Sequence, residues 1–498
     1  MIEPPYAEQV PEVYMRKRHI HSGAARHQTE IPKVECEMMN NIRIFIDFGS
    51  TFTKAVAFDL DKEELIARVQ SPSTVDTDVT VGLEKALALL AEQVEFGEAE
   101  IKEALASSSA AGGLRVVCCG LVPDFTTEAA RMAALGAGAK IVGTYSYELS
   151  NSEVAEIEAI SPDIVLLTGG TDGGNKKVII YNARMLANLK RGVKNIIVAG
   201  NKSAYDDIAG ILGKTDMNII FTKNVMSEIG VIDVDSTNQK IRELFINRIT
   251  EAKGIARVKT MVKDVIMPTP SAVMEAAKLI ADGVPGCPGR GELLLVDVGG
   301  ATTDVYSVAQ GSPTQPGVSM LGLPQPYAKR TVEGDLGLFH NLDTLADIAK
   351  RECAGALDDP FFDEKVTEFR QMGRLPSCEE EAECHVTLSR LAVKTAVERH
   401  AGRIDVIVTH NGDYMVQRGK DLTQVKLVIG AGGPVAFSSD PRRVLQGALF
   451  HKESPALLKP KNPLMMLDGK YILFAVGLLA QSEPRKAFNI INKYLVNL

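Results

Sequence analysis

Short runs of consecutive apolar residues alternate along the chain with segments whose apolar residues recur every three or four positions. A short apolar run is typical of a buried strand, and the longer spacing is typical of a helix with one buried face. The first predicted strands, at 42–50, 53–60 and 64–72, follow one another with only short turns between them. This order predicts an antiparallel meander rather than the strand–turn–helix unit of a dinucleotide site or a P-loop.

From about residue 75 the pattern changes, and predicted strands are separated by predicted helices. The strands are expected at 115–122, 140–146, 163–170, 195–201 and 218–223, and a helical stretch follows over 236–262. Repeated alternation of strands and helices predicts parallel strands joined by right-handed crossovers. We therefore expect a doubly wound α/β subdomain, inserted into the unit that the meander begins.

The meander occurs a second time, after a predicted helix. The segment IFIDFGSTFTK (44–54) aligns without a gap with LLVDVGGATTD (294–304). The matched positions include Asp47 with Asp297, Gly49 with Gly299, and Lys54 with Asp304. An internal repeat of this kind predicts two related lobes that face each other.

Composition narrows the class of protein. With 55 Lys and Arg against 63 Asp and Glu, the net charge is −8, so we expect no nucleic-acid partner. The longest apolar run, 471–480, is too short to cross a bilayer, so we expect no membrane segment. The cysteines number seven and are irregularly spaced, which favours reduced thiols and a cytoplasmic protein. Residues 1–40 mix Pro, His and both charges without a period, and we expect a disordered extension.

The two aspartate–glycine hairpins carry the groups that a phosphate chain needs. Asp47 and Asp297 end their strands and can hold Mg²⁺, which keeps its waters and takes few protein ligands. Lys54 can place a positive charge on phosphate oxygens during transfer. A single hairpin of this kind is more often a plain tight turn, but two matched copies favour a phosphate site. The predicted backbone and hydroxyl donors are Gly49, Ser50, Thr51, Thr53, Gly299, Gly300, Thr302 and Thr303.

A third glycine motif follows a predicted strand late in the chain, in VIGAGGPVA (428–436). Such a loop lets the backbone lie against a flat nucleoside ring, although an ordinary strand-to-helix turn is the alternative. Gly430, Gly432 and Gly433 are the residues predicted to contact the nucleotide here.

In this order, the motifs resemble those of the actin, sugar-kinase and heat-shock-chaperone ATPases. DFGSTFTK (47–54) resembles the first phosphate motif, DVGGATTD (297–304) the second, and VIGAGGPVA the adenosine motif. The resemblance implies an α/β, two-lobed actin-like ATPase fold, made of duplicated ribonuclease H-like domains, that binds ATP or ADP and Mg²⁺.

Two segments, 269–283 and 468–480, resemble the connecting helices of that superfamily. Their small residues Ala272, Ala276 and Gly477 would allow the helices to cross closely at a hinge. In heat-shock ATPases a Glu that helps to position water precedes the Pro of the first helix, whereas this chain has Thr269. The catalytic base is therefore left open.

With the insertion, the resemblance implies a division of the chain into five segments. They are an extension at 1–40, the first part of lobe I at 41–84, the inserted α/β subdomain with a helical tail at 85–265, lobe II with the adenosine site at 266–480, and a C-terminal segment at 481–498 that packs back on lobe I.

A narrower resemblance is to the MutL/GlmL proteins associated with glutamate mutase, a hydantoinase/oxoprolinase-like branch distinct from mismatch-repair MutL. The segments that carry it are LLTGGTDGGN, AGNK, TKNVMSEIG, PTPSAV, LLLVDVGGATTDVYSV and RTVEGDLG. This resemblance implies an accessory ATPase that acts as a chaperone or reactivating factor for an adenosylcobalamin-dependent mutase and releases the damaged cofactor.

Two further segments have open roles. A glycine loop in the insertion follows a predicted strand and precedes a helix. In that position it can bind an anion, a cobalamin group or a partner. The alternative is a wide turn with no ligand. Its residues are Gly169, Gly170, Thr171, Asp172, Gly173, Gly174 and Asn175. Glu333 or Asp335 can join the water shell of Mg²⁺, or else belong to a capped helix start.

Other functions remain open from the sequence. They are an ATP-dependent amidohydrolase subunit of the hydantoinase/oxoprolinase type, an actin-like filament protein, and a small-molecule kinase with Asp304 as base. The identity of the mutase and the oligomeric state are open as well.

Overall fold

The computed structural model describes residues 41–498, with gaps at 50, 75–76, 110–113, 190–191, 252–257, 259–260, 340, 353–365, 367–375, 377 and 411. The predicted extension at 1–40 and the predicted donor Ser50 lie outside the described residues. Over the part of the chain that is described, no helix has the length and apolar character needed to cross a membrane.

Lobe I is built on a sheet in which the predicted meander lies beside parallel strands. β1 and β2 pair antiparallel, as do β2 and β3, whereas β1 pairs with β4 and β4 with β10 in parallel. The order across the sheet is β10-β4-β1-β2-β3. The elements are β1 (Ile42–Phe48), β2 (Phe52–Asp59), β3 (Glu64–Pro72), α1 (Val79–Ala91), α2 (Glu98–Lys102), β4 (Leu105–Ser108) and β10 (Asp264–Pro268).

Lobe II repeats this arrangement in a second sheet, whose order is β16-β14-β13-β19-β20-β21. Its meander is antiparallel, and β13, β19 and β20 pair in parallel. The strands are β13 (Leu293–Val298), β14 (Thr303–Val308), β16 (Ala328–Glu333), β19 (Leu427–Ala431), β20 (Leu464–Leu467) and β21 (Val496–Asn497). The helices packed around this sheet are α10 (Leu342–Glu352), α12 (Glu379–His400), α13 (Gly433–Ala436) and α14 (Pro441–Leu445).

The first hairpins of the two lobes share one register. Asp47 lies opposite Lys54 in lobe I, and Asp297 lies opposite Asp304 in lobe II. In each turn the first glycine donates its N–H to the carbonyl three residues later, at 3.0 Å in lobe I and 2.8 Å in lobe II. The predicted repeat is confirmed, and the chain folds into two lobes with duplicated sheets.

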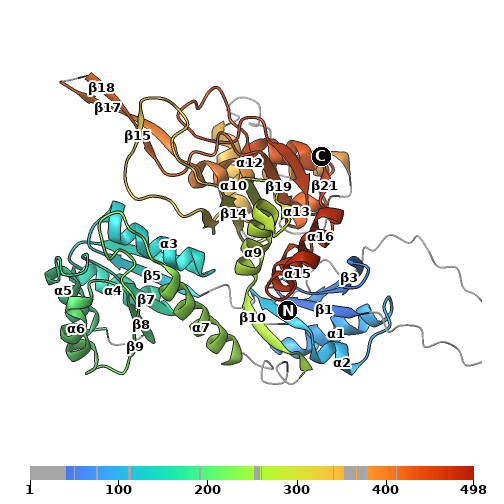
Figure 1. Cartoon of the computed structure of the whole chain (residues 1–498), viewed down its shortest axis with the longest axis horizontal. Helices are drawn as coiled ribbons and strands as arrows, with labels where there is room; N and C mark the ends of the chain where they lie inside the picture. The colour runs from blue at the N-terminus through green and yellow to red at the C-terminus, as the bar shows by residue number, and fades with distance from the viewer. Residues whose placement is uncertain are drawn as a thin grey trace, which may run out of the picture.

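The insertion forms a separate parallel sheet beside lobe I, in the order β6-β5-β7-β8-β9 (Figure 1). Along β5, Val116 and Cys118 pack on one side of the sheet and Val117 and Cys119 on the other, so both faces are covered. The predicted doubly wound subdomain is confirmed. Its elements are β5 (Arg115–Gly120), α3 (Glu128–Gly136), β6 (Lys140–Ser146), α4 (Asn151–Ile160), β7 (Ile164–Leu167), α5 (Lys177–Leu186), β8 (Asn195–Val198), α6 (Tyr205–Leu212), β9 (Asn218–Phe221) and α7 (Asp235–Glu251).

The insertion begins later than the expected residue 85. β4, a strand that the sequence analysis missed, belongs to the sheet of lobe I. The inserted subdomain therefore starts only at β5. With the sequence Leu-Ala-Ser-Ser, β4 has no long apolar run to mark it. It is a strand because β1 and β10 supply hydrogen bonds along both of its edges.

Two helices, α9 (Thr269–Asp282) and α15 (Leu473–Ala480), cross between the lobes (Figure 1). A β-carbon at Gly477 would lie 1.8 Å from the carbonyl oxygen of Ala272, so only glycine allows this approach. The close crossing expected from small residues is confirmed at this pair.

The C-terminal segment contacts both lobes. On α16 (Pro484–Tyr494), the Tyr494 hydroxyl accepts a hydrogen bond from the Leu65 N–H at 2.9 Å, and the Asn489 side chain donates to the Glu63 carboxylate at 2.9 Å. β21 then pairs with β20 at the edge of the lobe II sheet. This segment therefore joins the β2–β3 turn of lobe I to lobe II.

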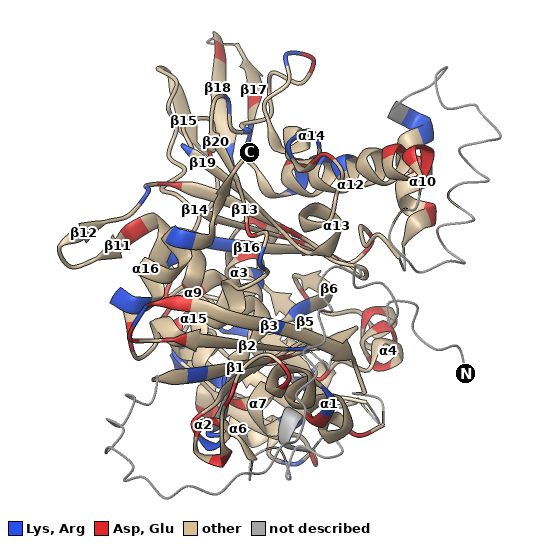
Figure 2. Ribbon diagram, turned by 90° about the vertical axis from the view of Figure 1, so that its right-hand side faces the viewer, with Lys and Arg blue, Asp and Glu red and all other residues tan. Residues whose placement is uncertain are grey.

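A hairpin projects from lobe II (Figure 1). β17 (Arg403–Thr409) pairs antiparallel with β18 (Gly412–Arg418), and β15 (Val318–Met320) lies on the other edge of β18. A smaller hairpin, β11 (Gly283–Val284) with β12 (Cys287–Pro288), follows α9. Basic and acidic residues are interspersed over the lobes and the insertion (Figure 2).

The helix crossing makes a testable prediction. We expect Gly477→Ala to lower the free energy of unfolding by about 1–3 kcal/mol, because the added methyl forces the backbones of α9 and α15 apart. Calorimetric melting would measure the effect. In Gly210→Ala, on α6, the new β-carbon meets nothing within 4 Å, and this control should be neutral or slightly stabilised. Equal melting of the two variants would contradict the close crossing.

Candidate functional site

Asp47 ends β1 and is buried, with its carboxylate oxygens held by different groups. Oδ2 lies 3.1 Å from Nζ of Lys54, which faces it across the hairpin. Oδ1 accepts hydrogen bonds from the hydroxyl of Thr269 at 2.6 Å and from that of Ser107 at 3.3 Å. Since Thr269 starts α9 and Ser107 lies on β4, this carboxylate is fixed from three elements.

Lys54 reaches from lobe I towards the start of α15, where its Nζ lies 4.0 Å from the ring centroid of Tyr471. Tyr471 has a φ of 56°, which residues with side chains seldom adopt. Burial opposes the ammonium charge, but the neighbouring Tyr471, Asp47 and Asp297 outweigh it and raise the lysine's pKa. Lys54 is therefore a permanently charged group between the two hairpins.

Asp297 ends β13 as the counterpart of Asp47, but its charge is not compensated in the same way. Among the residues that the structure describes, no group donates a hydrogen bond to its carboxylate. Burial, followed by the charge of Asp304, raises the pKa of Asp297 to about 7, although Lys54 opposes the rise. This carboxylate therefore keeps its proton to a higher pH than an ordinary aspartate does, and a cation beside it would stabilise the charged form.

The repeat differs at one charged position, where lobe I has Lys54 and lobe II has Asp304. The positive charge in lobe II comes from Arg330 on β16. Its Nε and Nη2 lie 2.8 Å and 2.6 Å from Oδ1 of Asp304, and the arginine is 6% exposed. In lobe I the cation, Lys54, lies in the hairpin itself, whereas in lobe II it is Arg330 on the third strand.

Arg330 has a counterpart in Arg68 of lobe I. Each lies on the third strand of its meander, with Arg330 opposite Tyr306 and Arg68 opposite Val56, which is the equivalent position. The guanidinium of Arg68 lies 5.6 Å from the ring centroid of Tyr471. The two arginines therefore occupy equivalent places and contact different partners.

The glycine loop predicted to contact adenosine lies against the second hairpin, because β19 pairs with β13. Gly432 has a φ of 89°, and a β-carbon there would lie 2.0 Å from the carbonyl oxygen of Val298 and 2.6 Å from Oδ1 of Asp297. Gly430 lies within β19, and Gly433 starts α13. The tertiary structure therefore brings the third glycine motif next to Asp297.

The predicted hydroxyl donors divide into two sets. Thr51 is exposed in the first turn, and the Thr302 hydroxyl, in the second turn, donates to the Asp304 carboxylate at 3.2 Å. Thr53 and Thr303 are buried, and the latter's hydroxyl donates to a main-chain carbonyl at 2.6 Å. Because successive side chains of a strand alternate between its faces, these two hydroxyls point into the core and not towards the predicted phosphate site.

Glu333 and Asp335, the acidic residues at the end of β16 and just after it, both form ion pairs with Arg399. One guanidinium nitrogen lies 2.7 Å from both Glu333 and Asp335, and these hydrogen bonds lower the pKa of Asp335. Backbone N–H groups further along donate to the carbonyls of Gly299 and Gly300 at 3.1 Å and 2.9 Å. The segment therefore supports the second turn through its backbone.

The two predicted Mg²⁺ ligands, Asp47 and Asp297, differ in how well their surroundings suit a metal ion. Among the described residues, no group of three or more His, Cys, Asp or Glu side chains is arranged to hold a metal. Mg²⁺ commonly keeps several waters and is bound through one or two carboxylates. Asp297, with its uncompensated charge, fits that role. Asp47, already bound to Lys54 and Thr269, would contribute through water.

The glycine loop of the insertion follows β7, at the carboxyl ends of the parallel strands. In the order β6-β5-β7, it lies beside the point where the strand order reverses, which is where open α/β sheets bind ligands. Asn201 donates to two loop carbonyls at 3.1 Å and 3.3 Å, and Asn224 donates to the Gly170 carbonyl at 3.0 Å and to Asp172 at 2.9 Å. Side chains thus define the loop's shape, while a β-carbon on Gly173 would enter open space.

Several groups of the site were missed from the sequence. Tyr471 lies just before α15, and Asp468 accepts hydrogen bonds from the N–H groups of Ile472 and Leu473 at 2.9 Å and 3.0 Å. The Asp-Gly pair just before a helix was an available capping signal for Asp468. Nothing in the local sequence marks Arg330, because its role depends on the strand register.

Comparison with known proteins gives one family and one close relative. A family model described as MutL protein matches residues 43–495. Protein MutL of Clostridium tetanomorphum is 43% identical over 460 residues, which cover 91% of this chain and 99% of that protein.

Among solved structures, the chain is similar to nucleotide-free acetone carboxylase, at 12% identity and a TM-score of 0.40, over 89% of this chain and 70% of that chain. It is also similar to glycerol dehydratase reactivase, at 9% identity and a TM-score of 0.32, over 89% of this chain and 100% of that chain.

The raised pKa of Asp297 makes stability depend on pH. The folded protein holds this proton up to about pH 7, whereas the unfolded chain releases it near 3.8. The cost of the buried charge is therefore absent at low pH, grows between about pH 4 and 7, and is complete above 7. We expect Asp297→Asn to be more stable than wild type by roughly 1–3 kcal/mol at pH 8 with chelator.

Melting temperatures at pH 5 and pH 8 would measure this difference, which should shrink at pH 5. The control Asp413→Asn, at an exposed position on β18, should match wild type at both pH values. A gain for Asp297→Asn that is equal at pH 5 and pH 8 would contradict the assignment.

Proposed function

The chain belongs to the MutL family, and we propose that it is an accessory protein that hydrolyses Mg-ATP and reactivates an adenosylcobalamin-dependent mutase. The observation that best supports ATP binding is the pair of matched hairpins, whose Asp47 and Asp297 both lie close enough to Lys54 to raise its pKa. The family resemblance supports a partner of the glutamate mutase type.

Lys54 is the residue proposed to bind the phosphate chain. Its ammonium has three donors, of which Asp47 accepts one, so capacity remains for a phosphate oxygen. The salt bridge to Asp47 and the contact with the Tyr471 ring hold the ammonium between the lobes. Positive charge in that position would stabilise the negative charge that moves between phosphate oxygens during hydrolysis.

Asp297 is the residue proposed to hold Mg²⁺, with Asp47 acting through water. The ion, when bound, neutralises phosphate charge and orients the phosphate chain. Because a cation favours the ionised carboxylate, binding at this site should release the proton that Asp297 holds near neutral pH. The two carboxylates thus have distinct roles, one fixed by hydrogen bonds and the other free to change protonation.

Thr269 occupies the helix start where heat-shock ATPases carry a Glu. Its hydroxyl donates to Asp47 at 2.6 Å, so we assign it the positioning of this carboxylate and not the role of a base. The same residue begins α9, which links the first hairpin to the helix crossing. Different affinities for ATP and ADP would shift the lobes about that crossing.

Removing the Asp297 carboxylate tests the ATPase directly. We expect Asp297→Ala to lower Mg-dependent phosphate release by at least about a hundredfold while the protein stays folded, because the metal loses its carboxylate. Phosphate release and circular dichroism would be measured on the same preparation. Asp413→Ala serves as the control, and normal hydrolysis by Asp297→Ala would contradict the site.

The partner is tested by phosphate release from Mg-ATP with and without an adenosylcobalamin mutase inactivated by damaged cofactor. Stimulated release together with recovered mutase turnover would support the reactivating function. Hydrolysis that ignores the mutase but rises with a cyclic amide would instead indicate an amidohydrolase subunit of the hydantoinase/oxoprolinase type.

The glycine loop of the insertion is the proposed contact for the partner or its cofactor. We expect Gly173→Asn to lower the ratio of mutase-stimulated to unstimulated phosphate release severalfold. Asn tolerates the positive φ of 77°, so the main change is a side chain in open space. Gly210→Asn on α6 provides the control, and an unchanged ratio in Gly173→Asn would exclude the loop from the contact.

A further inference from the structure

The turn between α3 and β6, residues 137–139, lies where the insertion meets both ATPase lobes. On the lobe I side, a β-carbon at Gly138 would lie 3.0 Å from atoms of both Pro268 and Ser271 at the start of α9. The Ser271 hydroxyl lies 3.4 Å from the carbonyl oxygen of Ala137. The turn therefore packs on the helix start whose first residue, Thr269, binds Asp47.

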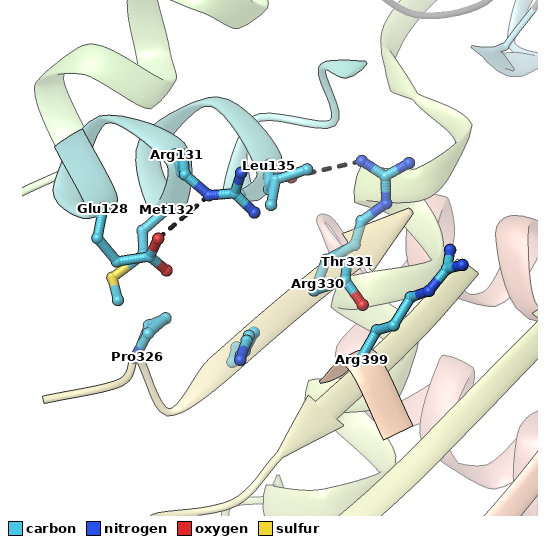
Figure 3. A pocket seen from close by; sticks show the side chains of 11 residues that line it. Glu128, Arg131, Met132, Leu135, Pro326, Arg330, Thr331 and Arg399 are labelled. Carbon is cyan, nitrogen blue, oxygen red and sulfur yellow. Dashed lines mark hydrogen bonds and ion pairs between the residues drawn. The ribbon is translucent and has the colours of Figure 1, made fainter. Parts of the chain in front are cut away.

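On the lobe II side, Arg330 makes the contact with the same turn. Nη1 of Arg330 lies 3.3 Å from the carbonyl oxygen of Ala139. It lies 3.5 Å from the carbonyl oxygen of Leu135 (Figure 3). The other guanidinium nitrogens bind the carboxylate of Asp304, at 2.8 Å and 2.6 Å. One buried side chain thus joins the second hairpin to the C-terminal end of α3.

The physical reason for this contact is electrostatic. A helix C-terminus carries partial negative charge on its last carbonyls, and a guanidinium can bind a carboxylate on one edge and a carbonyl on another. The other charged groups around the same cavity have partners of their own: Arg131 lies 3.1 Å from Glu128, and Arg399 binds Glu333. Because Arg330 is 6% exposed, the loss of one of these partners would cost free energy.

We propose that Arg330 couples the second nucleotide hairpin to the insertion, so that the α3–β6 turn reports the relative position of the two lobes. This inference rests on the proposed binding of nucleotide between the hairpins. The turn is held by α9 on one side and by Arg330 on the other. A rotation of lobe II against lobe I must therefore break one of these contacts or move the insertion.

The cavity at this junction leaves room for such a change. It has a volume of about 120 Å³ and lies between α3 of the insertion and β16 of lobe II (Figure 3). Arg330 acts here as a positioning residue, because it touches Asp304 and the α3 carbonyls and not the nucleotide.

Hydrogen exchange of the full-length protein tests the coupling. We expect Mg²⁺ with a non-hydrolysable ATP analogue to change the exchange rate of amides in 135–146 by at least about threefold. In Arg330→Lys, a single ammonium still compensates Asp304 but cannot also reach the α3 carbonyls. We expect this variant to bind the analogue and to lose most of the exchange response.

Arg131→Lys is the matched control, since Arg131 borders the same cavity and pairs with Glu128 within α3. Its exchange response should equal that of wild type. If Arg330→Lys does not fold, Ser271→Ala, which removes the hydrogen bond to the Ala137 carbonyl and leaves the packing on Pro268, should weaken the response instead.

A full response in Arg330→Lys, or in Ser271→Ala where that variant is used, would overturn the coupling. A wild type that binds and hydrolyses ATP without any response in 135–146 would overturn the coupling and leave the proposed function standing. A wild type that binds no nucleotide would overturn both.

Discussion

Two aspartates, Asp47 and Asp297, lie close to Lys54 between the two lobes, and the surrounding structure depends on how the charges of these and neighbouring carboxylates are compensated. Asp47 is bound by Lys54 and Thr269, and Asp468 is capped by the first N–H groups of α15. Asp304 is compensated by Arg330, which leaves Asp297 with a pKa raised to about 7. Incomplete compensation of one carboxylate makes this site suited to a cation and a phosphate chain.

The duplication of the sheets explains both the symmetry of the site and its departure from symmetry. Two hairpins in one register place Asp47 and Asp297 at equivalent strand ends. The positions opposite them carry charges of opposite sign, Lys54 in lobe I and Asp304 in lobe II. Lobe I therefore carries a cation in its own hairpin, whereas in lobe II the arginine of the third strand compensates Asp304.

Arg330 connects the second hairpin to the inserted subdomain. The doubly wound subdomain leaves lobe I after β4 and returns at β10, and its α3–β6 turn contacts the start of α9 and Arg330. An insertion held only by its two connections would move with lobe I alone. Contacts from both lobes allow it to respond to their relative position, which is what a subdomain that engages a partner would need.

Local sequence patterns determined much of this protein. The gap-free match of IFIDFGSTFTK with LLVDVGGATTD predicted the duplicated hairpins, and the strand–helix alternation predicted the parallel sheet of the insertion. Gly477 predicted a close helix crossing, because a missing side chain is useful where two backbones approach. Each of these signals depends on residue type and spacing within a short segment.

Tertiary structure alone decided the rest. β4 is a strand because two neighbours pair with it, and the burial of Thr53 and Thr303 follows from the face of the strand they occupy. Tyr471 and Arg330 enter the site from distant segments, so no local pattern marks them. Charge compensation and burial depend on which surfaces meet in space, and the order of residues along the chain does not contain that information in any short window.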